Sequence, residues 1–398
     1  MRYTFGDVSV DGDRFTIDHR GERLQVQPQV FDVLVHLIEH RDRVVSKEEL
    51  LDSVWGDQFV GESALTTRIK EARRAVGDDG ATQAVIRTAH GRGYQFVPEV
   101  DVEMPDPGAA PATAGPPTLE QRIRFCTTND GVRLGYATIG DGPPLVRAAH
   151  WLTHLDDDWN SPIWRHWLTG LARSRMLVRY DERGCGLSDH DPAEITFETF
   201  VEDLEAVVDD LGLERFPLLG ISQGGPVAIE YIRRHPERVS KLVLAGAYTQ
   251  GAMVRATTEE ARRERAVQLE MVRVGWGRED PSFRLFFTST FMPDAAPEMW
   301  DEFAKLLRRT TSAENAARII DATDVVDVTE TAEQIDVPTL ILHARDDRRV
   351  PFDEARKWAA LIRGSRLVPL DTSNHLKRPD EPAWERMLAE IDSFLAEE

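Results

Sequence analysis

A short turn near the middle of the chain could present a reactive hydroxyl group. Residues 220–224 read GISQG, with the apolar run FPLL before them and the helical pattern GPVAIEYIRRH after them. A serine on a sharp strand-to-helix turn needs small neighbours, because the strained backbone packs closely and lifts the hydroxyl into a cleft. Glycine and serine are common in turns, so it is the flanking strand and helix that favour a nucleophile. Ser222 is the candidate.

A serine hydroxyl is a poor nucleophile until a base takes its proton, so a histidine oriented by a carboxylate is required. VPTLILHARDDRRVP places Asp347 just after a strand, and SRLVPLDTSNHL places His375 just after the next one. The neighbouring Asp346 is an alternative acid because it ionises equally well. Other histidines precede the acid and are expected to be packing or surface residues: His150, His154, His166 and His343.

The segment HWLTH gives His150 and His154 a spacing that metal sites use, but it lacks the glutamate of H-E-x-x-H. We therefore expect no zinc there, and no metal or cofactor elsewhere.

The elements that must position these residues are indicated by hydrophobic runs. Strand-like runs at 177–180, 216–219, 242–245 and 339–342 alternate with helical patterns, which predicts a mainly parallel sheet. From about 250 to 330 the strand signal disappears, and we expect a helical lid. Its aromatic residues favour an apolar pocket and a largely apolar ligand; they are Trp276, Phe283, Phe286, Phe287, Phe291, Trp300 and Phe303.

A compositional break divides the 398-residue chain. DVEMPDPGAAPATAGPPTL, at 101–119, is rich in proline and alanine and predicts an extended linker. We expect one domain at 1–100 and a second at 120–398. With two cysteines, no signal peptide and no apolar run long enough to span a bilayer, we expect a cytoplasmic protein without a membrane partner.

The first domain has a compact α+β pattern. Ser46, with Glu49 three residues later, predicts a capped helix, and a second helix follows at about 62–76. Apolar residues mark the packing face of this second helix, and polar and basic residues lie off it. VIRTAHGRGYQFV then reads as a hairpin. Because the net charge of -21 repels nucleic acid at long range, DNA contact must rest on such a local basic surface.

This domain resembles the winged-helix effector domain of OmpR/PhoB-type regulators over residues 3–97, through RVVSKEELLDSVWG, the helix ending at Gly77 and the hairpin GRGYQF. The resemblance implies that the second helix enters the major groove of double-stranded DNA, with Arg73 and Thr88 as contacts. Glu71 and His90 stand where arginines are usual. The candidate DNA-binding residues are Thr66, Thr67, Arg68, Lys70, Arg73, Arg74, Thr88 and Arg92. A protein-binding winged helix is the alternative.

Residues 122–395 resemble the α/β-hydrolase superfamily, specifically its lidded serine esterases and lactonases. Besides the triad motifs, RYDERGCGLSD at 179–189 matches the D-x-R-G-x-G-x-S loop, whose role is structural. The resemblance implies oxyanion donors in the backbone N–H of Gln223 and in that of Trp151 or Leu152. Trp151 follows His150 where the family has glycine, so the oxyanion geometry is expected to differ and turnover to be slow.

These observations predict a transcription regulator whose hydrolase domain binds and hydrolyses a small apolar ester or lactone as its signal. No receiver-domain pattern precedes the winged helix, so the input is expected from the hydrolase domain, with a homodimer as one route to DNA. Two alternatives stay open. One is a metabolic serine esterase that carries a DNA-binding domain, and the other is a non-catalytic receptor on a hydrolase fold.

Overall fold

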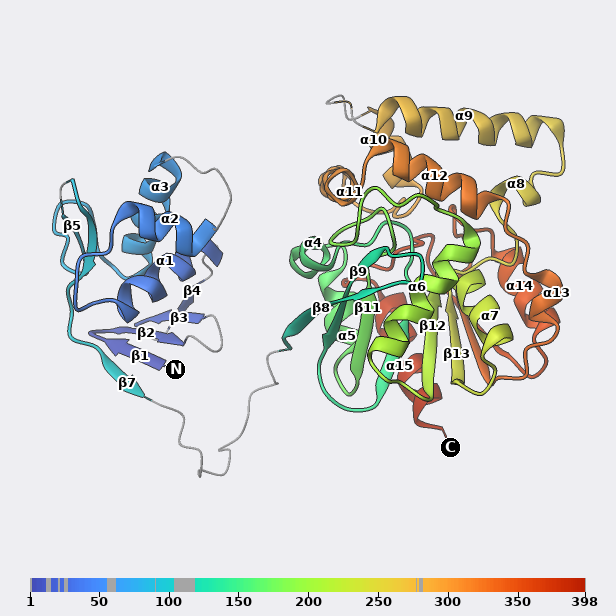
Figure 1. Cartoon of the computed structure of the whole chain (residues 1–398), viewed down its shortest axis with the longest axis horizontal. Helices are drawn as coiled ribbons and strands as arrows, with labels where there is room; N and C mark the ends of the chain where they lie inside the picture. Colours follow the sequence, from blue (N-terminus) through green and yellow to red (C-terminus); the bar gives the residue numbers. More distant parts are fainter. Residues whose placement is uncertain are drawn as a thin grey trace. The chain divides into compact units, whose positions relative to one another are not determined.

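The computed structural model describes residues 2–11, 16–20, 22–24, 28–55, 62–89, 91–103, 119–276, 278 and 282–397. The chain forms two compact units, Met1–Thr118 and Leu119–Glu398 (Figure 1). Within the described residues, no helix has the length and apolar character needed to cross a membrane.

The first unit contains a small antiparallel sheet with strand order β4-β3-β2-β1-β7. Its strands are β1 (Arg2–Phe5), β2 (Val8–Asp11), β3 (Thr16–His19), β4 (Glu22–Leu24) and β7 (Asp101–Glu103). Three helices and a hairpin complete it: α1 (Pro28–Glu39), α2 (Lys47–Trp55), α3 (Glu62–Ala75), β5 (Ile86–Ala89) and β6 (Gly93–Phe96). This is the predicted α+β winged helix-turn-helix.

The first three residues of the predicted linker belong to the sheet of the first unit. Residues 101–103 form β7, which pairs antiparallel with β1. The pairing partner β1 lies about 100 residues earlier in the chain, so no local pattern at 101–103 indicated this strand. Residues 104–118 of the predicted linker lie outside the described residues.

The predicted helix start at Ser46 is confirmed, because its hydroxyl oxygen accepts the backbone N–H of Glu49 at 3.1 Å. In α3, Leu65, Ile69 and Ala72 are buried in the core of the unit. Their spacing follows one helix face and leaves the polar residues outward.

The second unit is built on an eight-stranded sheet with order β15-β14-β13-β12-β10-β11-β9-β8. The six strands from β15 to β11 are parallel, and β9 and β8 add antiparallel. The strands are β8 (Gln121–Thr127), β9 (Arg133–Ile139), β10 (Pro144–Arg147), β11 (Met176–Tyr180), β12 (Phe216–Ile221), β13 (Val239–Ala245), β14 (Thr339–Ala344) and β15 (Arg366–Leu370). Every residue of β14 is buried, as expected for a strand covered on both faces.

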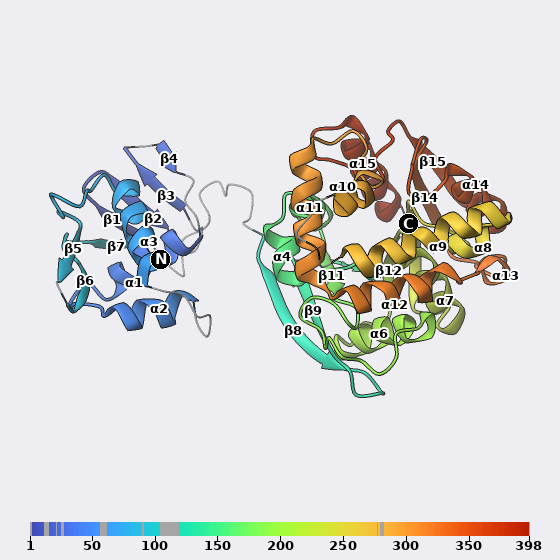
Figure 2. The same ribbon diagram turned by 90° about the horizontal axis from the view of Figure 1, so that it is seen from above.

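Helices cover the sheet and its carboxyl edge. Those packed around the sheet are α4 (Leu155–Asn160), α5 (Arg165–Leu171), α6 (Phe197–Asp210), α7 (Gly224–Arg234), α13 (Thr329–Ala332), α14 (Phe352–Leu361) and α15 (Pro382–Ala396). The predicted lid contains α8 (Ala252–Arg255), α9 (Glu259–Gly275), α10 (Ser282–Ser289), α11 (Pro297–Thr310) and α12 (Ala313–Asp324). Figure 2 shows α9 and α12 side by side above the sheet. The lid therefore closes the edge where the parallel strands end.

Candidate active site

Ser222 occupies the sharp turn between β12 and α7. Its φ is +52°, in the left-handed region that a residue with a side chain rarely adopts, and its N–H donates to the Ala245 carbonyl at 3.0 Å. A Cβ on Gly220 would lie 2.7 Å from the backbone of Gly225, and one on Gly224 would lie 3.0 Å from the carbonyl oxygen of Ala149. Only glycine fits at 220, so the motif is explained by close backbone packing that aims the serine out of the sheet.

Asp347 and His375, predicted from separate motifs, meet in the structure. Asp347 follows β14 and His375 follows β15, and the neighbouring parallel strands bring them together. His375 Nδ1 lies 2.8 Å from Asp347 Oδ2. The other oxygen, Oδ1, accepts the backbone N–H groups of Arg349 and Val350 at 2.8 and 2.9 Å. Asp346 is exposed, whereas Asp347 is buried beside His375.

The electrostatics keep Asp347 ionised. Burial alone would raise the pKa of this carboxyl, but the charge and hydrogen bond of His375, together with Lys377, hold it below its ordinary value. An ionised Asp347 accepts the Nδ1 proton of His375 and leaves Nε2 as the basic nitrogen. Within the described residues, Nε2 has no hydrogen-bond partner.

Ser222 and His375 line the same small cavity, of about 10 Å³. Its other walls are His150, Trp151, Trp164, Ile221, Phe291, Phe303 and Leu376. A serine hydroxyl and an imidazole nitrogen without a hydrogen-bond partner, placed in one apolar recess, can act as a nucleophile and its base. In such sites the hydrogen bond between the two groups can form when the substrate binds.

The alternative histidines have other roles. Burial lowers the pKa of His343 to about 4, and its Nε2 lies 2.9 Å from the Val350 carbonyl oxygen. His150 stacks on Trp164 with ring centroids 4.2 Å apart. His154 accepts the N–H of Asp157 and so caps α4.

Beside the serine, Gln223 immediately precedes α7, and Trp151 and Leu152 lie in the loop after β10. Leu152 has φ +49°, in the left-handed region. The Gln223 side-chain amide donates to the carboxyl group of Glu182 at 2.8 Å. Gln223, Trp151 and Leu152 therefore stay the candidates for backbone donors to an oxyanion.

Sequence reasoning did not identify Glu182, the variable residue of the D-x-R-G-x-G-x-S loop. It is 1% exposed. Burial and the nearby charge of Asp203 raise its pKa well above the ordinary value, and the hydrogen bond from Gln223 acts against this rise. Glu182 ties the loop after β11 to the turn that carries Ser222.

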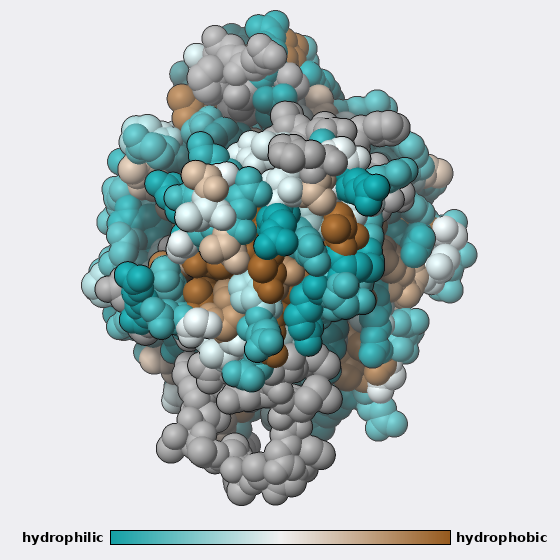
Figure 3. All heavy atoms as spheres, turned by 90° about the vertical axis from the view of Figure 1, so that its left-hand side faces the viewer, coloured by the Kyte–Doolittle hydropathy of each residue, from teal (hydrophilic) through white to brown (hydrophobic). Residues whose placement is uncertain are grey.

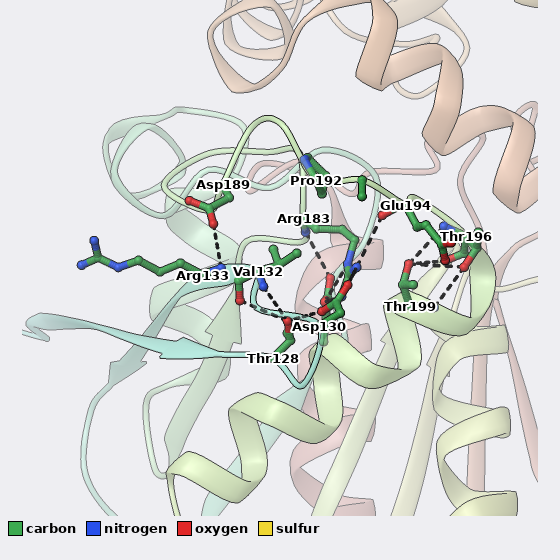
Figure 4. Close-up of polar contacts among 12 residues, drawn as sticks. Thr128, Asp130, Val132, Arg133, Arg183, Asp189, Pro192, Glu194, Thr196 and Thr199 are labelled. Carbon is green, nitrogen blue, oxygen red and sulfur yellow. Dashed lines mark hydrogen bonds and ion pairs between the residues drawn. The ribbon is translucent and has the colours of Figure 1, made fainter.

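The remainder of this loop is held by Arg183 (Figure 4). Its guanidinium binds Asp130 at 2.7 Å and the buried carboxylate of Asp203 at 2.7 and 2.9 Å. It also donates to the Glu194 carbonyl at 3.4 Å. These contacts agree with the structural role that the resemblance implied.

A larger cavity of about 280 Å³ opens beside Ser222 under the lid. Four of the predicted lid aromatics line it, namely Phe283, Phe286, Phe287 and Phe291. Trp276 and Phe303 pack in the core, and Trp300 is half-buried against it. Four arginines, which we did not predict, also line the cavity: Arg255, Arg265, Arg348 and Arg349. The sequence feature that could have indicated them is the pair Arg348 and Arg349, which directly follows the candidate acid Asp347.

The predicted DNA-binding residues divide into two groups. Arg73 donates to the Ile86 carbonyl at 2.8 and 3.0 Å and to the Thr88 hydroxyl at 2.8 Å, so both predicted contacts join α3 to the hairpin. Arg68 binds Glu71 at 2.7 Å.

The second group faces outward. Thr66, Thr67, Lys70, Arg74 and Arg92 are exposed, whereas His90 lies outside the described residues. The face of the unit that carries β5 is mostly hydrophilic (Figure 3). Lys70 and Arg74 lie one helical turn apart on α3, so they present two positive charges along one line of the helix.

One group of metal-ligand side chains occurs among the described residues, formed by His36, His40 and Glu49. Both oxygens of Glu49 already bind the guanidinium of Arg43, at 2.6 and 2.8 Å. This ion pair accounts for the carboxylate without a metal.

Comparisons with known proteins agree with this architecture. The family model "alpha/beta hydrolase fold" matches residues 152–381, and the model "Transcriptional regulatory protein, C terminal" matches residues 21–96. AB hydrolase superfamily protein YisY of Bacillus subtilis is 29% identical over 253 residues, covering 63% of this chain and 91% of that protein. A non-heme chloroperoxidase of Kitasatospora aureofaciens, CPO-A1, is 27% identical over 259 residues with the same coverage.

Among solved structures, an esterase from Exiguobacterium antarcticum matches with a TM-score of 0.57 and 25% identity, covering 69% of this chain and 99% of that one. The predicted hydrolase fold and the predicted regulatory domain are thereby confirmed. More than half of the chain matches the hydrolase model, so the protein belongs to the α/β hydrolase fold family and carries an OmpR/PhoB-type DNA-binding domain before it.

Proposed function

We propose that the protein is a DNA-binding transcription regulator whose hydrolase domain binds and hydrolyses a small acyl compound, of the ester or lactone class, as its signal. The observation that carries this proposal is the buried Asp347–His375 pair, whose free Nε2 shares a recess with Ser222.

In this reaction the Ser222 oxygen attacks the carbonyl carbon while its proton passes to Nε2 of His375. The backbone N–H of Gln223, together with that of Trp151 or Leu152, donates to the oxyanion. The bond to the leaving group breaks as His375 returns the proton to it, which leaves an acyl-serine. Water, deprotonated by His375, then releases the carboxylic acid and restores Ser222.

The test uses short and medium-chain p-nitrophenyl esters with the wild type, Ser222→Ala and the control Ser393→Ala, which changes an exposed serine on α15. Product release and intact mass are followed together. We expect release, or an acyl adduct, with the wild type and Ser393→Ala but not with Ser222→Ala. Equal release by Ser222→Ala, or neither release nor adduct with the wild type, would refute serine catalysis.

The regulatory part is tested separately, with a DNA fragment selected from a random pool by the wild type. We expect the Kd for this fragment to change when Ser222→Ala is given an ester that the wild type hydrolyses, because a signal must bind the two functional states differently. Sedimentation on and off DNA tests the proposed homodimer. An unchanged Kd would refute signalling by the ester and favour the alternative, a metabolic esterase that carries a DNA-binding domain.

A further inference from the structure

The cavity under the lid has a positive lining in an acidic protein. Arg255, Arg265, Arg348 and Arg349 face one carboxylate, Asp324, whereas the whole chain carries a net charge of -21. A concentration of one sign of charge within a cleft focuses the field and attracts ligands of the opposite sign.

The negative charge of Asp324 is already balanced by an ion pair with Arg265. Its two oxygens bind Arg265 through Nε at 2.5 Å and Nη2 at 2.8 Å, in a paired geometry that satisfies both groups. Arg255, at the end of α8, donates one hydrogen bond to the Gln250 carbonyl and lies over the ring of Tyr248, 5.4 Å from its centroid. The ion pair therefore leaves the charges of Arg255, Arg348 and Arg349 without a carboxylate in the cavity wall.

Arg349 is the most informative of the three. Its guanidinium carbon lies 5.0 Å from the ring centroid of Phe287 and 4.8 Å from that of Phe291. Within the described residues it has no side-chain hydrogen bond and no ion pair. Partial burial and the neighbouring arginines lower its pKa to about 10, so it stays charged at neutral pH. This partly exposed cation has no anionic partner beside it, and a ligand carboxylate would supply one through charged hydrogen bonds.

Arg349 is also fixed relative to the candidate triad. Its backbone N–H donates to Asp347 at 2.8 Å, and the same cavity is lined by Ser222. A ligand anion held by this side chain would thus keep a set position relative to the serine.

We propose that the ligand is an acyl compound bearing a carboxylate, with the carboxylate bound by Arg349 and Arg255 and the reacting carbonyl at Ser222. The hydrolysis of this ligand at Ser222 rests on the proposed function, whereas the binding of its carboxylate does not depend on it. The proposal also adds a charged end to the largely apolar ligand that the sequence led us to expect: the aromatic rings would contact the carbon chain, and the arginines the carboxylate.

The test compares mono-p-nitrophenyl adipate with p-nitrophenyl hexanoate, which have the same acyl length and leaving group and differ in the terminal carboxylate. We expect the wild-type kcat/KM to be higher for the adipate by about tenfold or more, the effect of one charged hydrogen bond. Arg349→Met and Arg255→Met should each reduce this ratio. Arg363→Met, at an exposed position away from the cavity, should leave it unchanged.

A ratio near one in the wild type, or a ratio unaffected by Arg349→Met in a variant with wild-type circular dichroism, would overturn the proposal. Calorimetry of Ser222→Ala with monoethyl adipate and with ethyl hexanoate separates binding from catalysis. Selective binding of the adipate without wild-type turnover would support the anion site and reject serine hydrolysis. Turnover of both esters with equal kcat/KM would support serine hydrolysis and reject the anion site.

Discussion

Replacing Asp347 by asparagine tests the candidate triad most directly. The asparagine oxygen can take the place of Oδ1 and still accept the N–H groups of Arg349 and Val350, so the loop should keep its conformation. Its NH2 group then meets His375 Nδ1, which accepts a hydrogen bond instead of donating one. The imidazole proton moves to Nε2, and the ring can no longer take the proton of Ser222.

The expected loss follows from this change of tautomer. In serine proteases the same substitution lowers kcat by about 10⁴-fold, which corresponds to about 5 kcal/mol of transition-state stabilisation. We therefore expect Asp347→Asn to lose nearly all hydrolysis of a p-nitrophenyl ester while KM changes little. Asp346→Asn is the matched control, since Asp346 is exposed and adjacent. Retained activity in Asp347→Asn, with loss in Asp346→Asn, would refute the assignment.

Stability gives a second readout of the same variant. The pKa of Asp347 is lowered in the folded protein, so its carboxylate stabilises the fold above the ordinary pKa of about 4 and less as the pH falls below it. The difference in unfolding free energy between wild type and Asp347→Asn should therefore shrink as the pH is lowered from 7 towards 3. A difference that does not change with pH would contradict the lowered pKa.

Two further predictions concern residues whose roles the structure revealed. Glu182→Ala should lower kcat by about 10²- to 10³-fold by releasing Gln223, whose backbone N–H is a candidate oxyanion donor, whereas Glu182→Gln, which keeps an acceptor, should lose less. Steady-state kinetics measures both, and an unchanged kcat in Glu182→Ala would contradict the bridging role. In the DNA-binding unit, Arg74→Ala should reduce the slope of log Kd against log salt by about 1 without changing the melting temperature. Arg73→Ala should also lower the melting temperature because it cuts the contact between α3 and the hairpin. A stable Arg73→Ala with weakened binding would instead support a direct DNA contact.

The local features of this protein follow from the sequence alone. The turn around Ser222, the cap at Ser46 and the alternation of strands and helices depend on neighbouring residues, and their spacing along the chain reveals them. The order of Ser222, Asp347 and His375 could likewise be inferred, because parallel strands end at the same sheet edge and bring late loops together.

Only the tertiary structure decided what lies around the candidate nucleophile. Arg255, Arg265 and Arg349 come from two lid helices and from the loop after β14, and no periodicity connects them. Glu182 bonds to Gln223, which is distant in the sequence, and Arg73 joins α3 to the hairpin through the Ile86 carbonyl. Hydrophobic spacing determines which face of an element is buried. The polar partners at a buried site depend on how the elements pack, which no single segment of the sequence records.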